Sequence, residues 1–235
     1  RGRRANMATA GRTTNWFAIW VTAAVIAVVA IVTTIVVVGN TQATSPGTPP
    51  DSQIVDADTG AISFGSGQDV VATYVDFMCP ACNAFEQTFG ESLDELASAN
   101  KITLELHPIA ILDRLSNGTR FSTRSANAMY CVAEASPDAA LPFLQGMFAQ
   151  QPAEVSDGLS DEQILTIAAS AGAADVGECV TEMRFEKFVV AMTKQLPADP
   201  ATGRTGTPTV AINGEYTPLN EIAASTDYFT QRFGG

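Results

Sequence analysis

The sequence predicts an α/β domain that carries a helical insertion and follows one membrane-spanning helix. Three patterns lead to this prediction. Residues 16–38 form an uncharged apolar stretch, residues 61–115 alternate between strand and helix patterns, and residues 116–199 are helical in pattern before β-pattern returns in residues 200–235. A strand, a helix and a second strand at this spacing form a βαβ unit, which places a parallel pair of strands in the sheet.

The uncharged stretch is long enough to span a bilayer. A helix of its length measures about 34 Å, and the hydrocarbon core of a membrane is about 30 Å thick. Four arginines and no acidic residue precede it, so the positive-inside rule places residues 1–15 in the cytoplasm as a short tail and the rest of the chain outside. We therefore expect a signal-anchor at the cell membrane, with a single pass over residues 16–38 and an extracytoplasmic domain.

A cleaved secretory signal is the alternative, because Thr41-Gln42-Ala43 is an acceptable cleavage site. The apolar core of such a signal is normally about 7 to 15 residues long, which favours the anchor. Initiation at Met7 would leave Arg12 and the amino terminus as the positive flank and would weaken the charge bias. Both interpretations export the domain.

The exported part of the chain is strongly acidic. Without the four N-terminal arginines, nine basic residues face 25 acidic ones, a formal charge of −16. Such a surface repels nucleic acid, so we expect no nucleic-acid partner. Residues 39–60, rich in Thr, Ser, Pro and Gly, are predicted to be a flexible linker between the membrane and the domain.

The strands are predicted from β-branched runs and period-two alternation. They are expected at residues 62–64, 70–75, 101–106, 208–212 and 215–217. His107-Pro108 is expected to end the third strand, because proline removes a ladder donor. Asn213-Gly214 is the strongest short signal for a β-hairpin and joins the last two strands.

The helices are predicted from apolar residues at three- and four-residue spacing. They are expected at residues 83–99, 119–135, 137–151, 160–171, 174–196 and 220–233. Ser160 followed by Gln163 is a capping-box start, while Pro137 and Gly172 mark helix boundaries. Residues 116–199 therefore form a helical insertion between two parts of one α/β domain.

The sequence Cys79-Pro80-Ala81-Cys82, called the CPAC motif below, stands between a predicted strand and a predicted helix. Two cysteines at this spacing can close a small disulfide, and the helix N-terminus favours a thiolate on the first sulfur. The motif is typical of a reversible two-electron redox site. In a cytosolic protein the same spacing is also typical of half a zinc site.

The rest of the sequence favours redox chemistry over metal binding. Tetrahedral zinc would need two ligands besides Cys79 and Cys82, and His107 is the only histidine. We expect His107 to be structural and the scattered methionines to pack in the core. We therefore predict neither a metal nor another cofactor.

Over roughly residues 61–233 the chain resembles the DsbA-like branch of the thioredoxin superfamily. The resemblance rests on the CPAC motif, on Thr207-Pro208 before the late hairpin, and on the helical insertion between them. The N-terminal anchor and the second cysteine pair resemble membrane-tethered members from Gram-positive-type envelopes. The resemblance implies a thioredoxin fold and a cis peptide bond before Pro208, which would face the two sulfurs. We expect Thr207 and Pro208 to bind an extended substrate.

The residues indicate a dithiol oxidase. A substrate thiolate attacks Cys79 in the oxidised form, Cys82 leaves, and a second substrate thiol resolves the mixed disulfide. A stabilised Cys79 thiolate favours the reduced enzyme and so makes the disulfide a stronger oxidant. We expect unfolded or reduced exported proteins as substrates. The resemblance implies reoxidation by a quinone-linked membrane oxidase of the DsbB or vitamin-K-epoxide-reductase type.

Other functions remain open on the same fold. Thr207 before the proline is shared with isomerase-type relatives, so a disulfide isomerase or an envelope disulfide reductase is the alternative. A metal-binding or peptide-holding module is a more distant one. Relatives often carry a buried carboxylate six residues before the first cysteine, and here that residue is Thr73. Asp76 or Glu105 is then a candidate for deprotonating Cys82, although Asp76 also suits a turn or cap.

The second cysteine pair is predicted to be structural. Once the CPAC motif closes on itself, Cys131 and Cys179 are left to pair across the helical insertion. Thiols of exported domains usually oxidise, and closing a loop of about fifty residues contributes roughly 4 kcal/mol in the chain-entropy treatment. The alternative is an electron relay to the CPAC pair.

Overall fold

The structure is a computed structural model that describes residues 46–234 and, nearer the N-terminus, residues 16, 20, 21, 23, 26–31 and 33. The predicted tail, residues 39–45 and much of the predicted membrane-spanning helix lie outside the described residues. Those residues of the predicted span that are described are helical. Within the described part of the chain, no helix combines the length and the apolar character needed to cross a membrane.

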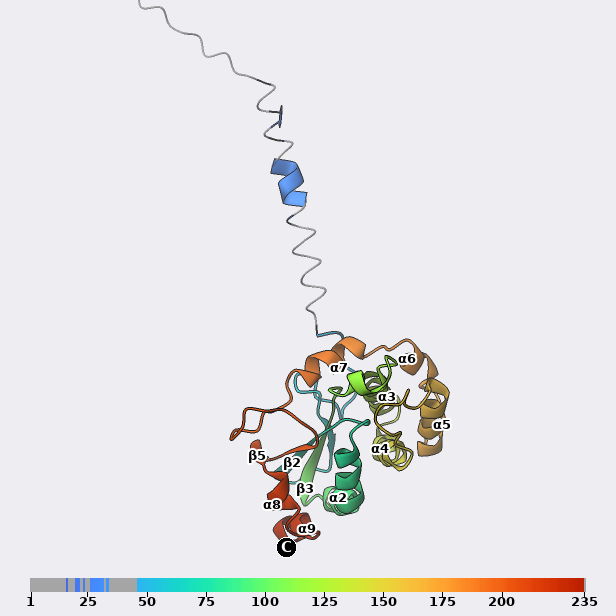
Figure 1. The fold of residues 1–235 in the computed structure, drawn as a ribbon, viewed down its shortest axis with the longest axis vertical. Helices are drawn as coiled ribbons and strands as arrows, with labels where there is room; N and C mark the ends of the chain where they lie inside the picture. Colours follow the sequence, from blue (N-terminus) through green and yellow to red (C-terminus); the bar gives the residue numbers. More distant parts are fainter. Residues whose placement is uncertain are drawn as a thin grey trace, which may run out of the picture. The chain divides into compact units, whose positions relative to one another are not determined.

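A mixed five-stranded sheet forms the centre of the folded unit (Figure 1). Its strands are β1 (Ile62–Phe64), β2 (Asp69–Val75), β3 (Ile102–Pro108), β4 (Thr209–Ile212) and β5 (Glu215–Thr217). They lie in the order β1-β3-β2-β4-β5; β2 and β3 are parallel, and the other neighbours are antiparallel. The long helix α2 (Pro80–Ser98) connects β2 to β3. The predicted βαβ unit, both hairpin strands and the thioredoxin-type fold are thus confirmed.

The third strand runs two residues further than predicted. Pro108 pairs with Val75 at the end of the parallel ladder. Its missing N–H does not matter there, because the next donor, the N–H of Ile109, bonds to the carbonyl of Val75 at 2.9 Å. His107 is buried and stacks on Tyr74 of β2, with ring centroids 4.1 Å apart, as expected for a structural residue.

Helices of the insertion lie beside the sheet as a separate layer (Figure 1). They are α3 (Phe121–Ala135), α4 (Ala140–Ala149), α5 (Asp161–Ala171), α6 (Gly177–Thr181) and α7 (Glu186–Thr193), with short 3-10 turns at Asp113–Leu115 and Pro137–Ala139. The capping box of Ser160 and Gln163 is present at the start of α5, and Gly172, at φ 105°, ends that helix. The helical insertion is therefore confirmed.

The prediction of one helix over residues 174–196 is wrong, because the chain breaks between α6 and α7. Met183 has φ 52° at the break. The side chain of Asn127, on α3, satisfies the backbone groups that the break exposes: its oxygen accepts the N–H of Phe185 at 2.8 Å, and its amide donates to two carbonyls at the end of α6 at 3.4 Å each. A buried amide from another helix thus stabilises a break that no local signal marks.

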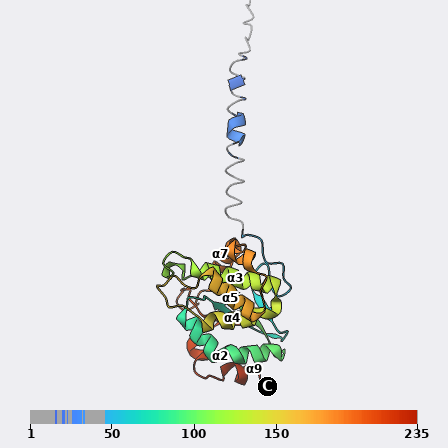
Figure 2. The ribbon, with the colours of Figure 1, turned by 90° about the vertical axis from the view of Figure 1, so that its right-hand side faces the viewer.

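The predicted closing helix over residues 220–233 is likewise two helices, α8 (Leu219–Ile222) and α9 (Tyr228–Phe233). Between them the chain turns, and the N–H of Tyr228 bonds to the carbonyl of Ser225 at 3.2 Å. This turn lets Phe229 meet Phe85 and Phe89 edge-on, with centroids 6.2 and 5.4 Å away. Figure 2 shows α9 lying along α2, so the last helix of the chain packs on α2.

The folded unit begins earlier than the sequence predicts. Residues 46–60, which the composition assigns to a linker, pack along α3. The N–H of Asp51 bonds to the carboxylate of Glu134 at 3.0 Å, and the hydroxyl of Ser52 bonds to a carbonyl of α3 at 2.7 Å. The buried Tyr130 donates its hydroxyl to the carbonyl of Gly60 at 2.9 Å. The boundary therefore lies near residue 46, not 61, because composition does not distinguish a free linker from an extended segment held by hydrogen bonds.

Candidate active site

The CPAC motif lies where β2 gives way to α2. Cys79 is the N-cap of the helix, in an extended conformation at φ −82° and ψ 115°, and its N–H bonds to the carbonyl of Asp76 at 2.9 Å. Pro80 takes the first helical position, where its fixed φ suits the helix and its missing N–H is no loss. The sulfur of Cys79 is therefore held at a helix N-terminus, beside amide groups that have no partner within the helix.

The two sulfurs of the motif differ in access. Both are free thiols in this structure. Cys79 keeps 7% of its surface exposed, whereas Cys82 keeps none. Cys79 is thus the accessible cysteine, as expected, although it is covered more fully than a solvent-facing residue would be.

Their surroundings also separate the pKa values of the two thiols. A hydrogen bond from the Cys82 side chain is the main cause that lowers the pKa of Cys79 to about 6; the Thr207 side chain and the amides of Cys82 and Ala81 add to it against the effect of burial. Burial raises the pKa of Cys82 well above its ordinary value, and the neighbouring Cys79 raises it further. At neutral pH the negative charge therefore belongs on Cys79.

Thr207 and Pro208 lie against the motif although they are far from it in sequence. Their peptide bond is cis, and the thiol of Cys79 donates to the Thr207 carbonyl at 3.3 Å. The hydroxyl of Thr209 bonds to the carbonyl of Gly206 at 2.8 Å and closes the turn around the proline. The structure thus places all the predicted site residues of the motif and of the Thr207-Pro208 turn together.

The carboxylate of Asp76 has the turn-forming role, and it is the backbone of Asp76 that interacts with the Cys82 thiol. Its carboxylate is fully buried and accepts four hydrogen bonds of 2.7–3.0 Å. The donors are the amides of Met78, Ile111 and Leu112 and the hydroxyl of Ser122. Burial raises its pKa, and these hydrogen bonds oppose the rise. The carboxylate therefore ties the active-site loop to the segment after β3 and to α3.

Glu105 does not face Cys82 either. It alternates along β3 with Leu104, which packs in the same hydrophobic cluster as Phe85 and Phe89 of α2. Glu105 therefore points to the opposite face of the sheet, where its carboxylate lies 3.7 Å from Nε2 of His107. Neither carboxylate that the sequence offers is placed to exchange a proton with Cys82.

Gln151 is a site residue that the sequence analysis missed. From just beyond α4, its amide donates to the carbonyls of Phe77 and Cys79 at 3.0 and 2.9 Å. It fixes the backbone on both sides of Met78 and joins the helical insertion to the active-site loop. The only sequence signal is a glutamine after a predicted helix, which resembles any exposed polar residue.

An open apolar groove of about 350 Å³ adjoins the motif. Its walls come from the motif itself, from α2, from the cis-proline turn and from α8; they include Ala81, Phe85, Phe89, Pro208, Leu219 and Ile222. The groove therefore reaches the motif at Ala81 and the cis-proline turn at Pro208. No group of three or more His, Cys, Asp or Glu side chains in the described part of the chain is arranged to hold a metal ion.

The second cysteine pair forms a disulfide. Cys131 on α3 and Cys179 on α6 are bonded, with their Cα atoms 5.9 Å apart and a sequence separation of 48. Both are buried in the core of the helical insertion. This is the pairing that the sequence predicts.

Comparisons with known proteins agree with this geometry. A protein-family model described as thioredoxin matches residues 65–226. The structure of reduced DsbG from Mycobacterium tuberculosis is 28% identical, with a TM-score of 0.62 over 76% of this chain and 90% of that one. Reduced DsbA from the same organism is also 28% identical, with a TM-score of 0.59 over 74% of this chain and 98% of that one.

Other similarities are more partial. MdbA of Actinomyces oris, a thiol-disulfide oxidoreductase, is 23% identical with a TM-score of 0.61 over 78% of this chain and 91% of that one, which shows a shared fold. The serine/threonine-protein kinase PknE of Mycobacterium tuberculosis is 27% identical over 115 residues, or 46% of this chain. The chain spans about a fifth of the length of that kinase. The chain therefore belongs to the thioredoxin family, within the DsbA-like group of thiol-disulfide oxidoreductases that the CPAC motif indicates.

Proposed function

We propose that the protein is an extracytoplasmic dithiol oxidase that introduces disulfide bonds into exported proteins through Cys79 and Cys82. The main support for this proposal is the difference between the pKa values of the two thiols. With a pKa of about 6, Cys79 is roughly nine-tenths thiolate at pH 7, whereas the buried Cys82 stays protonated. A stabilised thiolate favours the reduced enzyme over its disulfide, and such a disulfide oxidises other thiols readily.

The reaction follows from the positions of the sulfurs. A substrate thiolate attacks the accessible sulfur of Cys79 in the oxidised enzyme, and Cys82 leaves with the electron pair of the broken bond. A second substrate thiolate then attacks the substrate sulfur of the mixed disulfide. The substrate leaves with a new disulfide, and the enzyme is left with Cys79 as a thiolate and Cys82 as a thiol.

Thr207 orients the substrate in this proposal. In the reduced enzyme its carbonyl accepts a hydrogen bond from the Cys79 thiol at 3.3 Å. That bond is lost when Cys79 ionises or forms a disulfide, and the carbonyl is then free to accept a backbone N–H of an extended substrate. Pro208 has no N–H with which to compete. The adjoining apolar groove would bind an apolar side chain of an unfolded chain next to its reacting cysteine.

Two features support an extracytoplasmic location. The uncharged stretch of residues 16–38 follows four arginines, and the domain contains the Cys131–Cys179 disulfide, a type of bond that persists in oxidising compartments. Continued turnover there requires an oxidant. We propose a quinone-linked membrane oxidase of the DsbB or vitamin-K-epoxide-reductase type, which anchoring in the same bilayer would bring to high effective concentration.

The first test is the equilibrium of the CPAC pair against glutathione in the detergent-solubilised full chain, together with oxidative refolding of a reduced multi-cysteine protein. A dithiol oxidase is expected to show an oxidising potential and rapid formation of substrate disulfides, both lost in Cys79→Ser. A potential near that of thioredoxin with little substrate oxidation would instead indicate a reductase. Rapid reshuffling of mispaired disulfides without net oxidation would indicate an isomerase.

A further inference from the structure

The buried cysteine of the motif needs a group with which to exchange a proton. Cys82 leaves as a thiolate when substrate attacks and must become one again when the enzyme is reoxidised, yet burial strongly favours its neutral form. Asp76 has its lone pairs occupied by four donors, and Glu105 lies on the other face of the sheet. A different carboxylate meets the requirement.

Glu86 follows Cys82 by one turn of α2, so the two side chains start from the same side of the helix. Glu86 lines a small enclosed cavity between α2, the sheet and α4, which it shares with Thr73 of β2 and Gln145 of α4. The cavity measures about 10 Å³, close to the room that one water needs, and it has four polar lining residues, since Asp94 also contributes to it. The cavity places a carboxyl group beside Thr73, on the sheet face that α2 covers.

The same side chain reaches solvent on its other side. Glu86 also lines an open groove of about 550 Å³ together with Asn83, Gln87 and Gln145. Asn83 is the neighbour of Cys82 in sequence. Glu86 therefore lines both the enclosed cavity and the open groove, as Asp94 and Gln145 also do. Of these three residues it is the nearest to Cys82 along the chain, and a group that delivers protons to a buried site must also reach bulk water.

A glycine makes room for this carboxyl group. A Cβ built at Gly90, one turn after Glu86, would collide with Oε1 of Glu86. Glycine in the middle of a helix costs stability relative to alanine, so its presence in α2 calls for a reason. The space it leaves holds the Glu86 carboxyl in the interface between α2 and α4.

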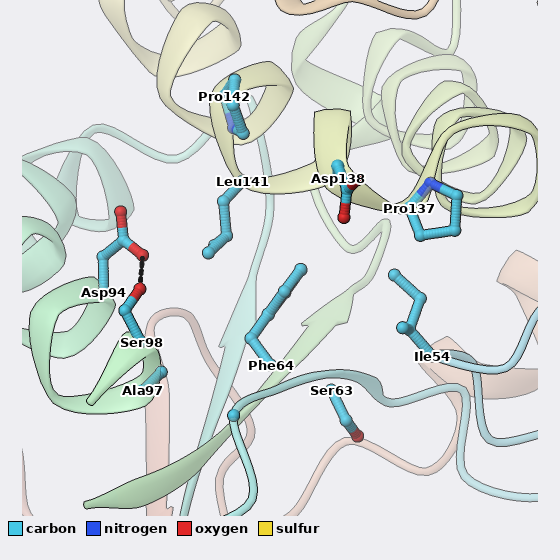
Figure 3. Close-up of a pocket in the computed structure, with 11 residues that line it drawn as sticks. Ile54, Ser63, Phe64, Asp94, Ala97, Ser98, Pro137, Asp138, Leu141 and Pro142 are labelled. Carbon is cyan, nitrogen blue, oxygen red and sulfur yellow. Dashed lines mark hydrogen bonds between the residues drawn. The ribbon is translucent and has the colours of Figure 1, made fainter. Parts of the chain in front are cut away.

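Burial and the charge near Glu86 let its carboxyl group exchange a proton near neutral pH. On α2 it is faced by the acidic residues Glu91 and Asp94. Asp94 also lines a second open cavity, shown in Figure 3, where its carboxylate accepts a hydrogen bond from the hydroxyl of Ser98 at 3.4 Å. The lining contributed by α4, β2 and β3 is uncharged. Burial, with Asp94 as the second cause, raises the pKa of Glu86 to about 7. Within the described residues its carboxyl has neither a hydrogen bond nor an ion pair, so both protonation states are accessible.

We propose that Glu86, one turn after Cys82 on the same side of α2, carries the proton to and from Cys82 during each half of the redox cycle. When a substrate thiolate bonds to Cys79, the disulfide breaks, Cys82 leaves with the electron pair, and it receives the proton of Glu86. On reoxidation by a disulfide, Cys79 first forms a mixed disulfide with the oxidant. The Glu86 carboxylate then takes the proton of Cys82, whose thiolate attacks Cys79 and expels the oxidant's second thiolate. The inference rests on the proposed function and deepens it.

The test follows ring closure, in which Cys82 attacks the mixed disulfide of Cys79. The reduced full chain in detergent is mixed with oxidised glutathione at a series of pH values between 5 and 9. The reaction is quenched rapidly with acid, free thiols are alkylated, and mass spectrometry measures the amounts of reduced protein, mixed disulfide and closed disulfide. In the wild type the rate constant of ring closure should rise through about pH 7 and then level off. In Glu86→Gln it should fall about 100-fold at pH 7 and keep rising with pH, because general acid–base catalysis of this kind contributes 10²–10⁴-fold.

Three further measurements make the result specific. Alkylation of Cys79 in Glu86→Gln should keep its midpoint near pH 6, because the thiolate there depends on other groups. Glu95→Gln, which removes an exposed carboxylate of the same helix, should leave ring closure unchanged. Gly90→Ala keeps the carboxyl but displaces it, and should slow ring closure by a smaller factor.

Each outcome decides one question. Wild-type ring-closure kinetics in Glu86→Gln would overturn the assignment of Glu86 while leaving the oxidase proposal intact. Failure of the wild type to form a mixed disulfide at Cys79, or to oxidise a reduced protein, would overturn the oxidase proposal itself. A loss in Glu95→Gln equal to that in Glu86→Gln would show a general charge effect of the helix and would also overturn the assignment.

Discussion

The protein contains two cysteine pairs that are both covered by side chains yet differ in their bonding. Cys79 and Cys82 are free thiols three residues apart, at the start of a helix and beside a turn from a distant part of the chain. Cys131 and Cys179 are bonded to each other across two helices. All four cysteines belong to one hydrophobic cluster, but hydrogen bonds from Cys82 and from backbone amides stabilise the thiolate of Cys79, whereas the sulfurs of the second pair are joined in a disulfide.

The exposed fraction of a cysteine does not by itself decide whether the cysteine reacts. Cys79 is 7% exposed and Cys179 is 5% exposed, so the two are nearly equal in access. What differs is the geometry of donors: Cys79 is at a helix N-cap, and Cys179 lies inside a short helix. Reactivity therefore follows from placing a sulfur where the backbone changes from strand to helix.

Cys82→Ser should have the largest effect, because it removes the second sulfur of the reactive pair. Such a protein cannot close its disulfide and should lose all catalytic turnover, while the Cys79 thiolate still forms mixed disulfides with other thiol compounds. Mass spectrometry of the protein after exposure to oxidised glutathione should show one stable adduct at Cys79. A second adduct at a cysteine of the helical insertion would show that the two pairs are not separate in function.

The matched change in the other pair should affect stability and not chemistry. Replacing Cys131 and Cys179 together by serine should lower the free energy of unfolding by about 2–4 kcal/mol, since the disulfide restricts a loop of about fifty residues in the unfolded chain. Denaturant unfolding measures the loss, and alkylation of Cys79 at several pH values measures its reactivity. A variant of normal stability that cannot turn over would instead establish the electron relay between the pairs.

The sequence predicts the reactive pair well, because its chemistry is local. Four consecutive residues at a strand-to-helix junction suffice to indicate Cys79 as the thiolate, and the resemblance supplies the turn at Pro208. The helix break at Met183 and the fixing of the active-site loop by Gln151 are not predictable in this way. Both depend on a side-chain amide that reaches backbone groups of a distant segment, and no pattern in the sequence near either end records that contact.

The free energy of unfolding should depend on pH through Glu86, which lies on the same helix as Cys82. The folded protein holds the pKa of Glu86 at about 7, above its ordinary value of 4.5, so folding favours the protonated form. The stability that this group contributes is fully present below about pH 4.5 and is lost as pH rises to about 7. Glu86→Gln should therefore match the wild type near pH 4 and exceed it above pH 7, by at most about 3 kcal/mol.

Urea unfolding of the wild type and of Glu86→Gln across this range measures the difference. At the Cys131–Cys179 disulfide, the side chain that hydrogen-bonds to a sulfur is the neutral amide of Asn127, which does not titrate. The pH-dependent difference should thus persist unchanged when Cys131 and Cys179 are both replaced. Parallel curves for the wild type and Glu86→Gln at all pH values would mean that Glu86 titrates as an ordinary exposed carboxylate.

The smallest effect on stability is expected at Gln151. Asn127 is its counterpart near the disulfide, since both residues use a side-chain amide to bind backbone groups. Gln151 donates to two carbonyls of the active-site loop, and Asn127 satisfies two carbonyls of α6 and the N–H of Phe185 before α7. Gln151 is only partly buried, so water can replace it, and Gln151→Ala should cost about 1 kcal/mol in denaturant unfolding. Asn127→Ala should cost more, about 2–3 kcal/mol, because it leaves buried backbone groups without partners.

The reactivity of Cys79 should show the opposite order. Gln151 bonds to the carbonyl of Cys79 itself, so its loss should loosen the N-cap and shift the pH midpoint of Cys79 alkylation, whereas Asn127→Ala should leave that midpoint in place. The physical reason is that each amide fixes the backbone beside one cysteine pair only. If Asn127→Ala moved the midpoint of Cys79 as far as Gln151→Ala does, the helical insertion would be acting on the active site through more than the contact at Gln151.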